Sequence, residues 1–167
     1  EPYAISKIAG IKMCESYNRQ YGTDYRSVMP TNTYGPNDKY DPENSHVIPA
    51  LLHKFHIAKK NKKNKIKIWG SGRALREFIY VDDLADACIF IMKLNKTKYQ
   101  KNIYPMQSHI NIGSGFELSI KKLTEIIAKI VNYNGKIVFD NKMPDGTLKK
   151  TLNSNLLNKM GFKASTN

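Results

Sequence analysis

The chain has 167 residues, of which 41% are hydrophobic and 25% are charged, and its net charge is +13. This length and composition suit a globular fold with its own core, and no apolar run approaches the roughly 18 residues that a membrane span needs. The two cysteines, Cys14 and Cys88, are too far apart in sequence for a metal or redox motif. We therefore expect a cytoplasmic protein with no membrane partner.

The basic charge raises the possibility of nucleic-acid binding. The densest basic run, KKNKKNK at residues 59–65, lies between a helical pattern and a strand pattern. It has no aromatic residues for base stacking and no groove-reading motif, so a solvated loop explains it better. We expect no nucleic-acid partner, although a basic nucleic-acid-binding module stays an alternative.

The first half of the chain predicts alternating helices and strands. Apolar residues spaced by three and four predict a helix over residues 3–21, which Gly22 ends. A strand over 25–29 leads into a loop over 31–45 that is rich in Asn, Pro, Gly and Asp. A second amphipathic pattern predicts a helix over 46–60, and a short strand follows at 66–69.

The second half continues the alternation. A strand is expected at 76–81, and an acidic pair then opens a helix over 82–94. A strand at 109–113 precedes a helix over 120–131 with Ser119 as its cap. A strand at 136–139 and a short helix from 153 that ends at Gly161 complete the chain. This alternation predicts an α/β fold with mostly parallel pairing.

Tyr3 and Lys7 form a Tyr-x-x-x-Lys pair, YAISK at residues 3–7. On a helix, residues four apart share one face, and an ammonium beside a phenol stabilises the phenolate. Tyr3 is thus a candidate general acid toward a carbonyl oxygen that gains a hydride. Such a spacing also occurs by chance in a chain rich in Tyr and Lys, so alone it does not decide between the two interpretations.

Two Gly-Ser-Gly segments and three histidines are weaker signals. The segments at 70–72 and 113–115 lack the third glycine of a dinucleotide fingerprint, since Leu75 and Leu118 occupy that place, so tight turns are expected. His46, His53 and His56 could share a helix face, but no cysteine or carboxylate joins them. We expect surface histidines and no metal site.

Several segments together resemble the extended short-chain dehydrogenase/reductase superfamily. They are YAISKIAG (3–10), MPTN (29–32) with YGP (34–36), WGSG (69–72), REF (76–78), VDDLA (81–85) and NIGSG (111–115). Finer segments narrow the resemblance to the GDP-L-fucose synthases: CESYNRQYG (14–22), ENSHVIPAL (43–51) and KMPDGT (142–147). The resemblance extends from the first residue to about Phe162.

The resemblance implies the carboxyl-terminal part of a Rossmann-type NAD(P)-binding fold together with a smaller α/β substrate-binding domain. Residues 1–35 would be the end of the cofactor domain. Residues 36–167 would be mainly the GDP-sugar domain, with some segments returning to the Rossmann sheet. The glycine-rich loop, the catalytic Ser and the catalytic Cys would lie upstream, so we expect this segment alone to be inactive.

The implied activity is NADPH-dependent conversion of GDP-4-keto-6-deoxy-D-mannose to GDP-L-fucose by 3,5-epimerisation and 4-reduction, in a homodimer. The resemblance assigns catalytic roles to Tyr3, Lys7 and His46. It assigns cofactor contacts to Lys7, Pro30, Thr31, Asn32, Thr33 and His46, and substrate contacts to Lys54, Trp69, Arg76, Asp145 and Lys150.

Two departures and two alternatives qualify this interpretation. Lys54 stands where the family commonly has Arg, and Asn153 stands where an Asp is usual. Neither change removes a proposed acid or base. The alternatives are a sister nucleotide-sugar epimerase or dehydratase of the same superfamily, and a non-catalytic nucleotide-sugar-binding protein.

Overall fold

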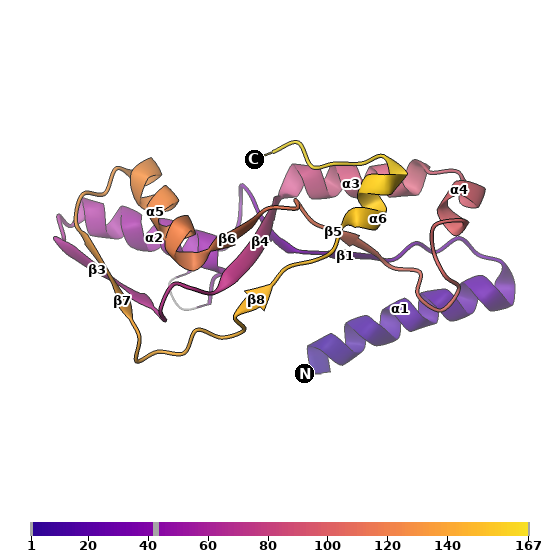
Figure 1. The fold of residues 1–167 in the computed structure, drawn as a ribbon, viewed down its shortest axis with the longest axis horizontal. Coiled ribbons are helices and arrows are strands. Elements are labelled where there is room, and N and C mark those ends of the chain that lie inside the picture. The colour runs from indigo at the N-terminus through magenta and orange to yellow at the C-terminus, as the bar shows by residue number, and fades with distance from the viewer. Residues whose placement is uncertain (1, 42–43, 167) are drawn as a thin grey trace. The chain divides into compact units, whose positions relative to one another are not determined.

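The computed structural model describes residues 2–41 and 44–166. The chain forms two compact units, whose elements are labelled in Figure 1. Unit 1 comprises Glu1–Thr33, Ile79–Gly115 and Leu152–Asn167, and unit 2 comprises Tyr34–Phe78 and Phe116–Thr151. Glu43, which opens one of the family-like segments, lies outside the described residues.

Unit 1 contains a parallel strand pair between helices. β1 (Val28–Pro30) pairs with β5 (Ile110–Ile112). Figure 1 shows α3 (Val81–Lys93) and α6 (Asn155–Met160) on one side of this pair and α1 (Pro2–Tyr21) on the other. The strands and the helices α3 and α6 share one core: Ile79, Ala87, Ile91, Tyr99, Ile110, Ile112, Leu157 and Met160. This layering is the α/β arrangement that the sequence predicted.

The helix α1 is fastened to unit 1 by a buried carboxylate. Glu15 is its one fully buried residue, and its side chain accepts hydrogen bonds from the Ser108 backbone N–H (2.9 Å) and from Lys12 Nζ (2.8 Å). Burial raises the pKa of Glu15, but the bonds from Lys12 and Ser108 outweigh it and the pKa lies below its ordinary value. The helix ends where Gly22 adopts φ +66° and its N–H donates to the Asn18 carbonyl.

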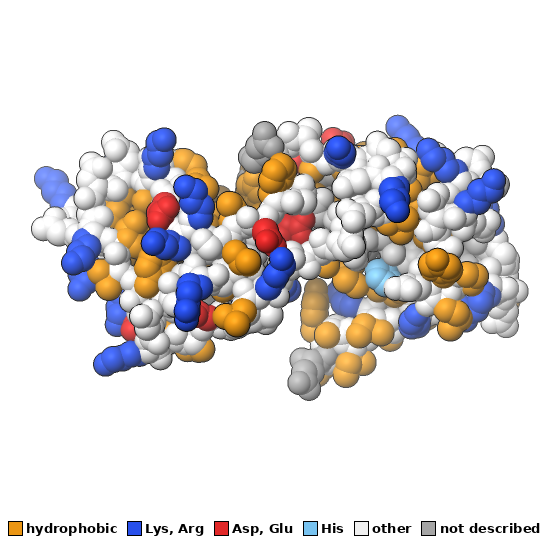
Figure 2. Space-filling model, viewed as in Figure 1, with side chains coloured by type: hydrophobic (Ala, Val, Ile, Leu, Met, Phe, Trp, Pro, Cys, Tyr) orange, Lys and Arg blue, Asp and Glu red, His pale blue; other side chains and the backbone are white. Residues whose placement is uncertain are grey.

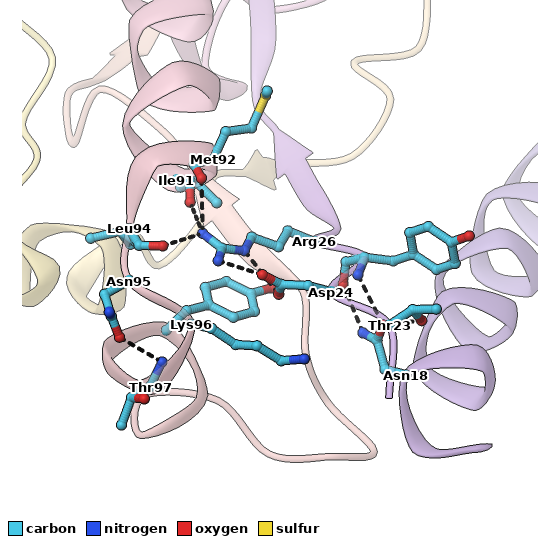
Figure 3. Close-up of polar contacts among 12 residues, drawn as sticks. Asn18, Thr23, Asp24, Arg26, Ile91, Met92, Leu94, Asn95, Lys96 and Thr97 are labelled. Carbon is cyan, nitrogen blue, oxygen red and sulfur yellow. Dashed lines mark hydrogen bonds and ion pairs between the residues drawn. The ribbon is translucent and has the colours of Figure 1, made fainter. Parts of the chain in front are cut away.

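Arg26 joins three parts of unit 1, as Figure 3 shows. Its guanidinium donates to the carbonyl oxygens of Ile91 and Leu94 at the end of α3 and pairs with Asp24 at 2.7 Å. The guanidinium also lies 4.7 Å from the ring centroid of Tyr99. A cation suits the carboxyl end of a helix, where the last carbonyl groups have no partner within the helix.

Tyr99 completes this cluster and belongs to a helix that the sequence did not predict. The helix is α4 (Lys96–Gln100), and the Asn95 side chain caps it by accepting from the Thr97 N–H. Burial raises the pKa of Tyr99 to about 12. The phenol is therefore neutral, and its hydroxyl donates to the Ser108 carbonyl at 3.0 Å.

The carboxyl-terminal segment is held by Asp83 at the start of α3. One carboxylate oxygen accepts from the N–H and the hydroxyl of Ser165, and the other accepts from the N–H of Thr166. Burial raises the pKa of Asp83, but these hydrogen bonds outweigh it and the pKa lies below its ordinary value. Asp83 thus holds the carboxyl-terminal segment, and its negative charge also stabilises the amino-terminal end of α3.

Unit 2 has a separate core between two helices and a two-stranded parallel sheet. β3 (Lys65–Trp69) pairs with β7 (Lys136–Asp140), and α2 (Val47–Lys60) and α5 (Ile120–Val131) lie together beside this sheet (Figure 1). The core consists of Leu51, Phe55, Ala58, Ile66, Ile68, Leu123, Ile127, Ala128 and Tyr133. The cap predicted at Ser119 is confirmed, because its hydroxyl accepts from the Lys122 N–H.

A second set of strands lies at the other end of unit 2. β4 (Leu75–Tyr80) pairs antiparallel with β6 (Glu117–Ser119) and parallel with β8 (Lys149–Lys150). The sequence predicted β4 but not β6, β8 or β2 (Asn32–Tyr34), which interrupts the loop expected over residues 31–45. These strands have two or three residues, too few for an alternating pattern to stand out.

The strand expected over 25–29 begins only at Val28. The preceding residues pair elsewhere: the Tyr25 N–H donates to the Asn18 side chain, and Asn18 donates back to the Tyr25 carbonyl. Arg26 is directed to the end of α3. Side-chain contacts therefore hold this segment in place of strand pairing.

The unit boundaries add detail to the expected domain division. Unit 1 ends its first segment at Thr33, and residues 79–115 and 152–167 pack with it. That unit 1 holds a cofactor and unit 2 a sugar nucleotide stays a prediction. Among the described residues, no helix is both long and apolar enough to cross a bilayer.

Replacing Arg26 with Ala should lower the free energy of unfolding by about 2–4 kcal/mol, because it leaves helix carbonyls and the Asp24 carboxylate without their buried partner. Arg26→Lys should recover part of the loss. The measurement is urea denaturation followed by circular dichroism. Arg19→Ala, which removes an exposed arginine from α1, is the control and should change stability by less than about 0.5 kcal/mol. Equal unfolding midpoints for the two Ala variants would contradict the role of Arg26.

Asp83→Asn should release the carboxyl-terminal segment, which hydrogen exchange at the Ser165 and Thr166 amides would detect. Because the pKa of Asp83 is lowered on folding, its ionised form stabilises the fold above the unfolded value of about 3.9. That contribution disappears as the pH falls through the lower folded pKa. The stability difference between parent and variant should therefore be full at neutral pH and shrink on acidification. A difference that grows on acidification would contradict the assignment.

Candidate functional site

A cavity of about 1110 Å³ lies within unit 2, along β3 and the facing side of α2. Its walls contain five cationic side chains, one carboxylate and one indole. These are Lys54, Lys63, Lys65, Lys67, Arg76, Asp145 and Trp69. Four of the five substrate residues implied by the resemblance, namely Lys54, Trp69, Arg76 and Asp145, thus line one cavity.

The alternation of β3 produces one side of this cavity. Ile66 and Ile68 are buried in the core, whereas Lys65, Lys67 and Trp69 are exposed, as the period of two in a strand requires. Trp69 is 69% exposed. An indole left open to solvent beside cations is available to stack on a planar ligand such as a nucleobase.

Lys67 also fixes the end of the neighbouring strand. Its Nζ lies 2.6 Å from the Asp140 carboxylate. The hydrogen bond from Lys67 lowers the pKa of Asp140 despite partial desolvation. Asp140 neutralises Lys67, whereas within the described part of the chain Lys54, Lys63, Lys65 and Arg76 have no ion pair.

The side chains of Arg76 and Lys54 differ in how firmly the surrounding residues hold them. Arg76 projects from β4, and its guanidinium donates to the carbonyls of Leu75 (2.7 Å) and Thr147 (2.6 Å). Lys54 projects from α2 and is largely open to solvent, but the surrounding wall desolvates its ammonium enough to lower its pKa. Arg76 is therefore held by its neighbours, whereas Lys54 can move toward a ligand.

Asp145 lies against the turn that follows β3. Its two carboxylate oxygens accept from the Ser71 backbone N–H (2.6 Å) and the Ser71 hydroxyl (2.7 Å). Hydrogen bonds from Ser71 hold the pKa of Asp145 below its ordinary value, and the charge of Arg73 adds to this. The segment 70–72 is the tight turn that was expected, with Gly70 at φ +76° and Gly72 at φ +77°.

His46 and Lys150 are in unit 2 but are not among the residues that line the cavity. His46 is the exposed cap residue of α2: its carbonyl accepts the Ala50 N–H, and its side chain makes no capping bond. Its neighbours in sequence, Ser45 and Val47, do line the cavity. Lys150 is an exposed residue of β8 in register with Arg76.

Tyr3 and Lys7 are neighbours on α1 in unit 1. Tyr3 is 75% exposed, and Lys7 Nζ lies 5.3 Å from the centroid of its ring. The structure therefore brings the two side chains together, as the spacing predicted. Both are accessible to a ligand.

The predicted cofactor segment, Pro30 to Thr33, runs from the last residue of β1 into β2. Next to it the chain leaves β5, and the Thr31 N–H donates to the Ile112 carbonyl at 2.9 Å. The carboxyl ends of neighbouring parallel strands are where open α/β sheets bind their ligands. Lys7, Pro30, Thr31, Asn32 and Thr33 all belong to unit 1, and their contact with a dinucleotide stays a prediction.

Sequence reasoning missed several cavity residues. Lys63 and Lys65 were assigned to a solvated loop, and His53 was treated as a surface histidine, yet all three line the cavity. The alternation Lys-Ile-Lys-Ile-Trp could have placed Lys65 beside Trp69. In the part of the chain that the structure describes, no group of three or more histidine, cysteine or acidic side chains is placed to hold a metal ion.

The fold defines a class of protein. The parallel strand pair between helices and the polar segment at its carboxyl end are features of a Rossmann-type α/β protein. The chain belongs to the NAD dependent epimerase/dehydratase family, which residues 1–113 match.

The chain is also similar to individual proteins of known name. It is 55% identical to a GDP-L-fucose synthase of Escherichia coli (strain K12) over 97% of this chain and 50% of that protein. A GDP-D-glycero-L-gluco-heptose synthase structure from Campylobacter jejuni has a TM-score of 0.80 and 33% identity over 96% of this chain and 54% of that one.

A GDP-L-fucose synthetase of Naegleria fowleri bound to NADP has a TM-score of 0.78 and 28% identity over 98% of this chain and 49% of that chain. The chain thus spans about half the length of the relatives it matches.

The cavity should bind a diphosphate group. Trp69 is the only tryptophan of the chain, so its emission reports on the cavity. Inorganic pyrophosphate should change this emission, and Lys54→Met should weaken binding by roughly tenfold through the loss of one cation. Lys149→Met, which removes an exposed lysine outside the cavity lining, should have little effect. Equal affinities of the two variants would show that binding is not in the cavity.

Proposed function

We propose that the protein containing this chain converts GDP-4-keto-6-deoxy-D-mannose to GDP-L-fucose, with NADPH as the reductant. The observation that carries the proposal is the cationic cavity with an open indole and a fixed carboxylate, in a chain 55% identical to a GDP-L-fucose synthase. Cations suit the diphosphate, the indole of Trp69 suits the guanine, and Asp145 supplies a hydrogen-bond acceptor.

The proposed reaction needs acid–base groups. A ketone at C4 of the sugar acidifies the protons at C3 and C5, so a base and an acid on opposite faces can invert both centres through an enolate. His46, at the start of α2, is proposed as the acid, with an upstream cysteine as its partner. Its side chain makes no capping bond, which leaves the imidazole available to a substrate.

The proposed reduction uses Tyr3 and Lys7. Bound NADPH supplies the hydride that C4 receives. Tyr3 gives its hydroxyl proton to the C4 oxygen, and Lys7 supports the resulting phenolate and binds a ribose hydroxyl of the cofactor. Exposed Tyr3 and the Lys7 ammonium beside its ring support these roles. Lys7, Pro30, Thr31, Asn32, Thr33 and His46 would contact the cofactor, and Lys54, Trp69, Arg76, Asp145 and Lys150 the GDP-sugar.

Location and assembly are parts of the same proposal. The protein would work in the cytoplasm as a homodimer, with neither nucleic acid nor membrane as a partner. Figure 2 shows lysine and arginine side chains dispersed over the visible face instead of gathered in one stripe, which supports the exclusion of nucleic acid.

The test joins this chain to a glycine-rich cofactor-binding half, either its own upstream sequence or the matching half of the Escherichia coli relative. NADPH oxidation with GDP-4-keto-6-deoxy-D-mannose should yield GDP-L-fucose. Tyr3→Phe should lower kcat by roughly 10²- to 10⁴-fold, because it removes the general acid. His46→Gln should block inversion and so prevent formation of GDP-L-fucose.

Matched controls separate chemistry from folding. Tyr21→Phe removes a hydroxyl from the same helix, and His56→Gln changes an exposed histidine of α2 outside the cavity lining. Both should keep normal turnover. Reduction without inversion at C3 and C5 would indicate a different GDP-sugar reductase of the same family. GDP-sugar binding with no NADPH oxidation would indicate a binding protein.

A further inference from the structure

Ser71 has an unusual relation to Asp145, because one residue serves both oxygens of the carboxylate. The Ser71 backbone N–H donates to Oδ1 at 2.6 Å, and its hydroxyl donates to Oδ2 at 2.7 Å. Two donors from one residue fix both the position and the rotation of the carboxylate plane.

Arg73 determines which way the Ser71 hydroxyl points. The Arg73 backbone N–H and its Nε–H both donate to Ser71 Oγ, at 3.2 and 3.1 Å. A hydroxyl has two acceptor lone pairs and one proton. Since both lone pairs are occupied by donors, the proton is directed to Asp145. The hydrogen-bond chain therefore runs from Arg73 through Ser71 to the carboxylate in one direction only.

The glycine before Ser71 makes this contact possible. Gly70 adopts φ +76°, and a Cβ atom placed on it would lie 2.3 Å from Asp145 Oδ1. A larger residue would push the carboxylate away and would also strain the backbone. The turn that resembles a phosphate loop thus holds a carboxylate, whose negative charge would repel a phosphate at that position.

Asp145 lines the cavity, but Ser71 does not. A carboxylate has about four acceptor positions, of which Ser71 occupies two, and the Gly72 N–H contributes a weaker hydrogen bond. At least one acceptor position is therefore left for a ligand. A guanosine nucleotide offers two kinds of hydrogen-bond donor, the N–H groups of the base and the hydroxyls of the ribose.

We propose that Ser71 is a positioning residue, which holds the Asp145 carboxylate so that it accepts hydrogen bonds from a donor group of the bound guanosine nucleotide. This inference rests on the proposed function. In this proposal the turn after β3 contributes to nucleotide specificity. The cations of the cavity bind the diphosphate of any nucleotide.

The test measures binding of GDP, IDP and 2′,3′-dideoxy-GDP to the intact protein by Trp69 emission or calorimetry. IDP lacks the guanine amino group, and the dideoxy analogue lacks the ribose hydroxyls. Ser71→Ala should weaken GDP binding by roughly 5- to 20-fold, the usual effect of losing a hydrogen bond to a charged group. It should also reduce the preference for GDP over whichever analogue lacks the contacted donor.

Several variants distinguish positioning from a general loss of structure. Ser71→Thr keeps the hydroxyl and should restore both affinity and preference, whereas Gly70→Ala should behave like Ser71→Ala. Ser165→Ala is the matched control, because Ser165 also donates through its N–H and hydroxyl to a carboxylate, that of Asp83 in unit 1. It should leave GDP binding unchanged.

The pH dependence of GDP affinity distinguishes the two roles of Ser71. A purely structural role would leave this pH dependence unchanged. Ser71 keeps the pKa of Asp145 low, so its removal should let the carboxylate protonate at a higher pH. The affinity ratio between parent and Ser71→Ala should therefore be constant from about pH 7 to about pH 5 and widen below about pH 5, as the carboxylate of the variant approaches the ordinary Asp pKa of about 3.9.

Failure of the parent to bind GDP would contradict the proposed function and, with it, this inference. GDP binding that Ser71→Ala leaves unchanged in affinity and nucleotide preference would overturn the inference alone.

Discussion

The parallel pairing of β3 with β7 is the constraint on which the candidate cavity depends. The register matches Ile66 with Ile137 and Ile68 with Phe139, which directs the apolar side chains into the core of unit 2. Because side chains alternate along a strand, the same register turns Lys65, Lys67 and Trp69 outward. A slip of one residue would bury the lysines and expose the isoleucines. β3 thus contributes Ile66 and Ile68 to the core of unit 2 and three exposed side chains beside them, and residues of both sets line the cavity.

The sequence predicted the long elements well, and for physical reasons. Helix α5 was located from its apolar spacing and its Ser119 cap, and α6 from the glycine at 161, which adopts φ +110°. The strand β1 was misplaced because the Tyr25 backbone bonds to the Asn18 side chain and the Arg26 guanidinium donates to a backbone carbonyl at the end of α3. Local periodicity does not report such contacts. The helix α4 was missed because it is short and mostly polar.

The residues of the candidate site could be predicted from the sequence where they belong to a sequence motif. They could not be predicted where their role depends on residues that are close only in the folded structure. Family-like segments pointed to Trp69, Arg76 and Asp145, which line the same cavity in the structure. Ser71 was visible only as part of a Gly-Ser-Gly turn, since its partner lies more than seventy residues away in the chain. The place of His46 relative to Tyr3 stays a prediction, because the two belong to different units.

The order of the segments along the chain has a consequence for synthesis. Unit 2 is complete once Thr151 has been made, whereas unit 1 still needs Leu152–Asn167, which contributes Leu157 and Met160 to its core. Domains fold largely as units while the chain emerges from the ribosome. The cavity-bearing unit can therefore close before unit 1 does. During that interval the aliphatic surface against which α6 packs is open, and such a surface favours misassembly of a nascent chain or its capture by a chaperone.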